Sequence, residues 1–160
     1  MIRHFLFLIA IYLLAGCANN ESTTSNPNLN QPEMNETNQP PEWVYQTNIY
    51  EVNVRQYTKE GTFNAFEKEL PRLKDMGVKT LWFMPITPIA QMNKKGTLGS
   101  YYAAADYTSI NPEFGTMDDF KRLVKSAHEQ GFKVIIDWVA NHTGWDHVWT
   151  KTNPEYFEKD

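Results

Sequence analysis

The sequence EQGFKVIIDWV (residues 129–139) decides the fold, because a helix end and a hydrophobic strand follow each other in it without a break. Gly131 ends the expected helix, and residues 133–139 form the expected strand. The same order of residues occurs earlier in the chain, in DMGVKTL (residues 75–81). Two copies of one helix-to-strand step predict helices that alternate with parallel strands, which is the α/β class.

Two further strands are expected before this one. Residues 48–57 (NIYEVNVRQY) alternate in polarity and include several β-branched and aromatic side chains, which favours a strand. Residues 80–86 (TLWFMPI) form a continuous apolar run, as is typical of strands buried on both faces of a parallel sheet. A long loop separates this strand from Thr116, and long loops inside compact domains tend to carry function.

Two helices are expected between the strands. The first ends at Gly77 and is indicated by apolar residues at helical spacing: Phe63, Phe66, Leu70, Leu73 and Met76. Asn64 and Glu67 have the spacing of a capping box, and Pro71 predicts a kink or a late start of the helix. The second helix begins at the cap formed by Thr116 and Asp119 and carries one apolar stripe: Phe120, Leu123, Val124 and Ala127.

Three strands that alternate with two helices fit either an α/β barrel or a doubly wound sheet. The Gly-rich phosphate-binding turn of a dinucleotide fold is missing after residues 48–57, and this favours the barrel. In such a barrel the active site lies at the carboxyl ends of the strands. The residues to consider are therefore 55–57, the loop from Pro85, and 137–142.

The amino-terminal residues have the composition of an export signal and a linker. Residues 1–16 combine a short basic start with an apolar run too brief to span a bilayer, which predicts a signal peptide. Leu14-Ala-Gly-Cys17 resembles the bacterial lipoprotein box, so we expect lipidation of Cys17 and an exported, membrane-anchored lipoprotein in the periplasm or on the cell surface. An ordinary secretory signal with a coincidental cysteine is the alternative. Residues 17–41 read as a disordered tether rich in Asn, Pro, Ser and Thr.

The overall charge and the cysteine count exclude several classes of function. The net charge of −4 comes with scattered lysines and arginines, so no basic surface is expected and nucleic acid is not an expected partner. A single cysteine cannot form an internal disulfide or a cysteine-based zinc site.

Polar residues at the end of the strand at 133–139 are the strongest candidates for chemistry. Asp137 lies inside a hydrophobic strand, where an ionised carboxylate is costly without a partner. It therefore has a cationic partner or is functional. Asn141 offers a carbonyl oxygen suited to a hard cation, and His142 an imidazole that can donate a hydrogen bond to a hydroxyl group.

These residues resemble the α-amylase family of glycoside hydrolases. DWVANH (residues 137–142) is similar to the family's first conserved block, and GSYYAAADY (99–107) with NPEFGT (111–116) is similar to its strand-2 loop signature. The resemblance implies an incomplete (β/α)8 TIM barrel, with its first three strands and two helices in residues 42–139. Residues 140–160 would begin the small second domain that the family inserts after strand 3.

The resemblance also implies roles for individual residues. His142 would hydrogen-bond the sugar at the cleavage subsite, Tyr102 would stack on that sugar, and Asn141 would bind a structural calcium ion. Asp137 would pair with an arginine at the end of strand 4, and Asp106 would shape the site. His147 is given no metal role.

The implied reaction is hydrolysis or transfer of α-glucosidic bonds in starch-like glucans by a retaining mechanism. That mechanism needs a nucleophile and an acid/base, which the family carries on strands 4 and 5. None of the last acids, Glu155, Glu158 and Asp160, lies in a similar context. We therefore expect no catalytic residue in this chain. We also expect the chain to be an amino-terminal fragment that does not turn over glucans by itself. A non-catalytic glycan-binding lipoprotein and an inactive remnant are the alternatives.

Overall fold

The computed structural model describes residues 39–158, which form one unit. The predicted signal peptide, Cys17 and the tether as far as residue 38 lie outside the described residues. The described elements, in chain order, are η1 Glu42–Gln46, β1 Ile49–Val52, α1 Val54–Tyr57, α2 Phe63–Glu67, α3 Leu70–Asp75, β2 Thr80–Phe83, α4 Met117–Glu129, β3 Lys133–Ile136, α5 Trp149–Thr152 and η2 Pro154–Tyr156. In residues 39–158 no helix combines the length and the hydrophobicity needed to cross a bilayer.

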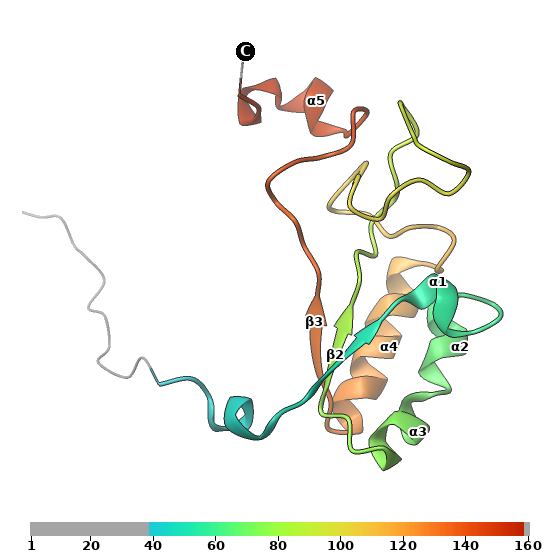
Figure 1. Cartoon of the computed structure of the whole chain (residues 1–160), viewed down its shortest axis with the longest axis vertical. Coiled ribbons are helices and arrows are strands. Elements are labelled where there is room, and N and C mark those ends of the chain that lie inside the picture. The colour runs from blue at the N-terminus through green and yellow to red at the C-terminus, as the bar shows by residue number, and fades with distance from the viewer. Residues whose placement is uncertain (1–38, 159–160) are drawn as a thin grey trace, which may run out of the picture. The chain divides into compact units, whose positions relative to one another are not determined.

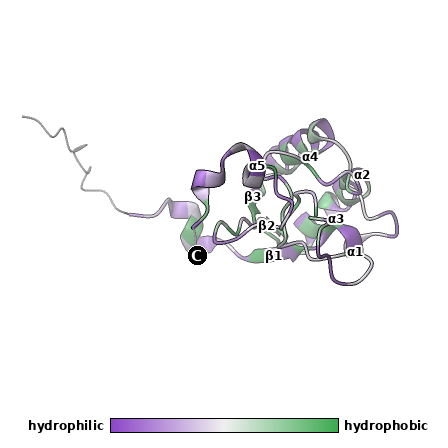
Figure 2. Ribbon diagram, turned by 90° about the horizontal axis from the view of Figure 1, so that it is seen from above, coloured by the Kyte–Doolittle hydropathy of each residue, from purple (hydrophilic) through white to green (hydrophobic). Residues whose placement is uncertain are grey.

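The three strands form one parallel sheet in the order β1-β2-β3, which confirms the α/β prediction. Thr80 lies opposite Ile49 on one side and Lys133 on the other, so the strands are in register. Helices α2, α3 and α4 lie on the same side of the sheet (Figure 1). In Figure 2 the helices show hydrophilic as well as hydrophobic residues, as expected for elements that bury only one side.

Both predicted helix-to-strand junctions have the same geometry. Gly77 and Gly131 have positive φ angles of 84° and 89°. The Gly77 N–H donates to the Lys74 carbonyl, and the next N–H, of Val78, donates to the Leu73 carbonyl. The N–H groups of Gly131 and of the residue after it repeat this pattern at the end of α4. Two Schellman motifs therefore end the helices, and glycine is favoured at both because it adopts the left-handed conformation without strain.

The first predicted strand was too long. β1 ends at Val52, and Val54–Tyr57 forms the helical turn α1 instead of continuing the strand. The chain then folds back so closely that a Cβ atom on Gly61 would lie 2.8 Å from the Arg55 carbonyl oxygen. This reversal requires a turn where the alternating pattern indicated a strand.

The other two strands are also shorter than predicted, and they end together. β2 stops at Phe83 and β3 at Ile136, although the Asp137 N–H still donates to the Phe83 carbonyl at 2.8 Å. Pro85 has no N–H and cannot continue the ladder, so the sheet opens at this level.

The first predicted helix is divided in two, as Pro71 indicated. α2 is followed by α3, and Pro71 lies in the first turn of α3, where its missing N–H needs no partner. The predicted cap at Asn64 was wrong, because the Thr62 hydroxyl accepts the hydrogen bond from the Ala65 N–H. Thr116 and Asp119 form the predicted capping box of α4.

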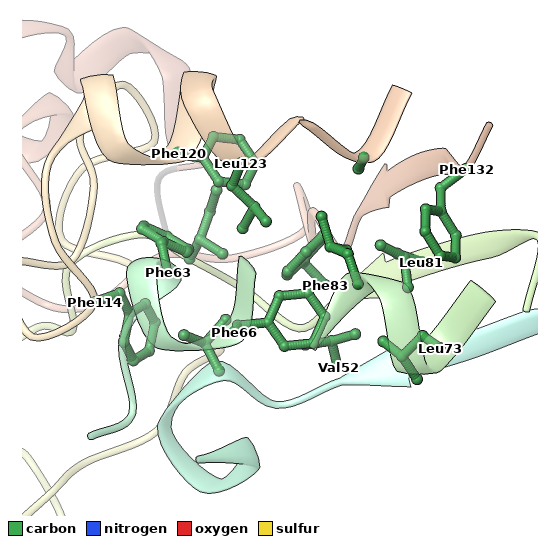
Figure 3. Close-up of a cluster of buried hydrophobic side chains, with 14 residues drawn as sticks. Val52, Phe63, Phe66, Leu73, Leu81, Phe83, Phe114, Phe120, Leu123 and Phe132 are labelled. Atoms are coloured by element: carbon green, nitrogen blue, oxygen red, sulfur yellow. The ribbon is translucent and has the colours of Figure 1, made fainter. Parts of the chain in front are cut away.

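The core lies between the sheet and the helices. Figure 3 shows Phe66 and Phe83 pointing toward one another, and their rings meet edge to face with centroids 5.4 Å apart. Phe120 and Leu123 of α4 cover the same cluster, and Leu123 and Phe83 are fully buried. Met76, predicted as part of the stripe, is 58% exposed because it caps α3. The core fixes the relative positions of the strand ends that carry the site.

Candidate functional site

The site begins with one hydrogen bond between the two motifs. Tyr102, in the loop after β2, donates its hydroxyl hydrogen to Asp137 Oδ2 at 2.9 Å. Asp137 is the first residue after β3, so this contact joins the loop of one strand to the end of the next. The hydrogen bond to this carboxylate, together with burial and the negative charge of Asp137, raises the pKa of the Tyr102 hydroxyl above its ordinary value.

Asp137 differs from its sequence prediction in one respect. It does not lie inside the strand but just beyond it, and it is half-buried rather than enclosed. Its side-chain partner in the described residues is the neutral Tyr102 hydroxyl. Partial exposure and this donor reduce the cost of the charge. The arginine partner implied by the resemblance stays a prediction.

A second tyrosine fixes the base of the same loop. The Tyr101 hydroxyl donates to Asn53 Oδ1 at 3.2 Å, just after β1. The guanidinium of Arg55 lies 4.7 Å from the centre of the Tyr101 ring, and its Nε donates to Glu113 Oε2 at 3.0 Å. Cation–π and ionic contacts therefore tie the loop to the end of β1. Glu113 could not be predicted from the sequence, because its partner Arg55 lies 58 residues away along the chain.

Asp106 organises the turn that follows Tyr102. Its carboxylate accepts hydrogen bonds from the Thr108 N–H at 2.8 Å, from the Thr108 hydroxyl at 2.7 Å and from the Ser109 hydroxyl. Burial by itself would raise the pKa of Asp106, but the hydrogen bonds from Ser109 and Thr108 lower it below its usual value. The carboxylate thus stays ionised and keeps the turn in shape. Its predicted effect on the site stays a prediction.

Asn141 and His142 lie in the segment after β3 with their side chains exposed. Asn141 Nδ2 is 3.5 Å from His142 Nδ1. The main-chain carbonyl of His142 accepts a hydrogen bond of 2.8 Å from the Tyr107 hydroxyl, which also contacts the Val139 carbonyl at 2.7 Å. The imidazole of His142 is therefore accessible, while its backbone is tied to the loop after β2. No role was predicted for Tyr107 from the sequence, although Tyr107 is the last residue of the loop motif at 99–107.

An apolar groove of about 580 Å³ adjoins these residues. Its walls include Tyr107, Ile110, Ile136, Trp138 and Trp149, and Asp137 lies at its edge. Trp138 is 62% exposed. The groove runs along the side of β3 on which no further strand is described.

In residues 39–158 no group of three or more His, Cys, Asp or Glu side chains could hold a metal ion. The exposed Asn141 side chain offers one oxygen, and calcium takes six to eight oxygen ligands. Asn141 could therefore supply one calcium ligand, but residues 39–158 do not form a complete calcium site.

Comparison with known proteins identifies the family. Residues 21–160 match the family described as alpha amylase, catalytic domain. Alpha-amylase SusG of Bacteroides thetaiotaomicron is 44% identical over 89 residues, which are 56% of this chain and 12% of that protein. Trehalose-6-phosphate hydrolase of Bacillus subtilis is 40% identical over 119 residues, which are 71% of this chain and 20% of that protein.

A solved structure agrees with the fold. The crystal structure of an alpha-amylase from Lactobacillus plantarum matches 70% of this chain and 26% of its own, with 51% identity and a TM-score of 0.68. This similarity confirms the predicted barrel, of which the described residues form an incomplete part with three parallel strands. The chain spans between 11 and 21% of the length of these curated relatives. With its strand-end motifs joined as described, the chain belongs to the α-amylase catalytic-domain family.

Proposed function

We propose that the protein carrying this segment is an α-amylase-type glycoside hydrolase that acts on α-glucosidic bonds of starch-like glucans. Family membership supports the reaction class. The observation that carries the proposal for this chain is the hydrogen bond of 2.9 Å between Tyr102 and Asp137, which joins the two motifs at the strand ends. It fixes the hydroxyl end of the Tyr102 ring, and we propose that a face of this ring takes the sugar.

The two proposed sugar contacts have complementary chemistry. A pyranose ring presents C–H groups on its face and hydroxyl groups at its rim. The Tyr102 ring can stack on the face, and the exposed imidazole of His142 can donate a hydrogen bond to a hydroxyl group. Asp137 acts through Tyr102 as a positioning residue, because its described contact is with the tyrosine hydroxyl.

The bond-breaking step is proposed for the protein as a whole. A retaining glycosidase uses one carboxylate as nucleophile and a second carboxyl group as acid and then base. We assign neither role to a residue of this chain, and we expect the 160-residue chain alone to show no turnover. Hydrolysis above that of a His142→Ala control would contradict this assignment.

The relatives include both a hydrolase and a transferase. The Bacillus subtilis relative is named trehalose-6-phosphate hydrolase, while a relative from Rhodospirillum rubrum is named alpha-1,4-glucan:maltose-1-phosphate maltosyltransferase. We favour hydrolysis of a starch-like glucan because the Lactobacillus plantarum alpha-amylase shares 51% identity with this chain. Product analysis with maltoheptaose distinguishes the two, since transfer yields products longer than the substrate.

The sugar contacts are tested by kinetics of the protein that carries this segment, with maltoheptaose as substrate. Loss of a stacking face or of a hydrogen-bond donor in Tyr102→Ala or His142→Ala is expected to lower kcat/KM by roughly ten- to a hundredfold. Tyr45→Ala is the matched control, because Tyr45 is an exposed tyrosine on η1. Equal kcat/KM values in all four proteins would overturn the proposed roles.

Two further features are proposals about the rest of the protein. Calcium would be held by the Asn141 side-chain oxygen together with ligands from outside residues 39–158, and Asn141→Ala should then weaken calcium binding in isothermal titration. An unchanged calcium affinity would contradict this role of Asn141.

Cys17 would carry a lipid that anchors the exported protein in a membrane. Labelled palmitate should enter the wild type and not Cys17→Ala, and equal labelling would contradict this.

A further inference from the structure

His147 is a histidine without an assigned role, and it is fully buried. Its ring packs against the rings of Tyr107 and Trp149, with centroids 4.9 Å away in each case, and those two rings lie 5.5 Å from each other. Tyr107 comes from the loop after β2, while His147 and Trp149 follow β3. The three rings therefore join the two loops that also carry Tyr102 and His142.

The hydrogen bond of His147 fixes its protonation state. Nδ1 accepts a hydrogen bond of 3.1 Å from the main-chain N–H of Trp149, so this nitrogen carries no proton and the neutral ring holds its proton on Nε2. Nε2 is buried without a hydrogen-bond partner among residues 39–158. Burial lowers the pKa of His147, and the nearby charge of Asp106 opposes this effect. A neutral ring therefore acts as acceptor and packing surface at this position.

Tyr107 carries the effect of this cluster to the proposed sugar site. Its ring contacts Trp138 and Trp149, with centroid distances of 5.7 and 5.5 Å. Its hydroxyl reaches the carbonyls of Val139 and His142 at 2.7 and 2.8 Å. These two carbonyls are the first and last of the segment 139–142, so one side chain holds both ends of it.

This segment has little other support. After the Asp137 N–H, the next main-chain N–H to bond another main-chain group is that of Gly144, which donates to the Ala104 carbonyl at 2.8 Å. In the described part of the chain, residues 138–143 make no backbone–backbone hydrogen bond. The Tyr107 hydroxyl is therefore the main fixed point of their backbone.

We propose that Tyr107 is the positioning residue for His142, and that the neutral ring of His147 holds Tyr107 in place. The inference rests on the proposed function, because it assigns His142 to the sugar. Tyr107 touches no sugar in this proposal. It acts by keeping the backbone of 139–142 in the one arrangement that presents the imidazole.

The first test needs no sugar. ¹⁵N relaxation of the 160-residue chain is compared among the wild type, Tyr107→Phe and Tyr101→Phe. Tyr107→Phe keeps the ring and removes the two contacts with the carbonyls of Val139 and His142. Tyr101→Phe is the control, because it removes a hydroxyl group of the same loop whose partner is Asn53. Only in Tyr107→Phe should the order parameters of residues 140–143 fall from about 0.85 to about 0.6 or lower. Unchanged values would overturn the proposal.

A second variant isolates His147. His147→Phe keeps an aromatic ring against Tyr107 but leaves the Trp149 N–H without its acceptor, so residues 140–143 should become more mobile than in the wild type and less than in Tyr107→Phe. Order parameters equal to the wild type would remove His147 from the proposal.

The third measurement separates this proposal from the proposed function. In the protein that carries this segment, Tyr107→Phe should lower kcat/KM for maltoheptaose by roughly five- to tenfold, the equivalent of one hydrogen bond, with Tyr101→Phe as control. If wild type and Tyr107→Phe have equal kcat/KM, the positioning role is wrong. If His142→Ala has no effect, the proposed function fails, while the relaxation result still decides whether Tyr107 orders the segment.

Discussion

β2 and β3 begin alike and end differently. Each follows a helix that stops at a positive-φ glycine, and they pair in register, with Phe83 opposite Ile136. Phe83 is nevertheless fully buried, while Ile136 is 44% exposed. β2 has a strand on each side, whereas β3 has a described neighbour on one side only.

The difference shows that burial of a strand is a property of its neighbours. The apolar run at 133–139 has the composition of a buried strand, yet Ile135, Ile136 and Trp138 are each at least 40% exposed in this part of the barrel. The segment after β3 is ordered mainly by side chains from the loop after β2. β2 therefore lies inside the closed core, while β3 lies at the side of the sheet with no further described strand.

The largest expected effect separates the paired residues Phe83 and Ile136. In the 160-residue chain, Phe83→Ala removes a side chain packed on Phe66 and should lower the free energy of unfolding by about 3–5 kcal/mol. Ile136→Ala should cost about 1 kcal/mol or less, since much of that side chain already contacts water. Urea denaturation measures both, and equal costs would mean that β3 is covered as fully as β2.

Gly→Ala at the two helix-to-strand junctions should lower the stability equally, in contrast to substitutions in the strands that follow them. Nothing lies within 4 Å of a Cβ atom added at Gly77 or Gly131, so Gly→Ala costs only the strain of a positive φ, roughly 1–2 kcal/mol. Asn should be tolerated better than Ala at both positions. Thermal unfolding checks this, and a cost at one junction only would show that the two helix ends are not equivalent.

Acid should act on the segment after β3. Because the folded state lowers the pKa of His147, the unfolded chain binds more protons just below the ordinary value of 6.5. Stability should therefore fall as the pH drops from 6.5 toward the lowered pKa and stay constant above 6.5. Unfolding midpoints between pH 5 and 8 test this. His147→Gln should flatten the profile and the exposed His128→Gln should not; identical profiles in the two variants would contradict the assignment.

The smallest expected effect is local to the contact between the two loops. Asp137 raises the pKa of the Tyr102 hydroxyl, so Asp137→Asn should bring it back toward the ordinary value of 10.0. A titration followed by NMR of ¹³C-labelled tyrosine resolves this change. An unaltered Tyr102 pKa would mean that the hydroxyl does not rely on that carboxylate.

Local sequence signals predicted what depends on local contacts. The capping box at Thr116, the late helix start at Pro71 and the two glycine exits involve residues a few positions apart, and all are present. The parallel order of the strands followed from their alternation with helices.

Features that depend on distant contacts were not predicted. β1 was expected to continue to residue 57 because its alternation is clear, but the close approach of Gly61 to Arg55 requires a turn. In the site, Tyr102 and Asp137 were named separately, and only the fold shows that they bond to each other. Tyr107 was missed because its carbonyl partners lie more than thirty residues along the chain.

The central claim is that the strand-end motifs present Tyr102 and His142 to an α-glucan. Cross-saturation NMR from bound maltoheptaose to the protein that carries this segment tests it most directly, because it reports which side chains contact the sugar. Strong transfer is expected to the Tyr102 ring and the His142 imidazole, and none to Tyr45 on η1. Binding without transfer to Tyr102 and His142 would contradict it.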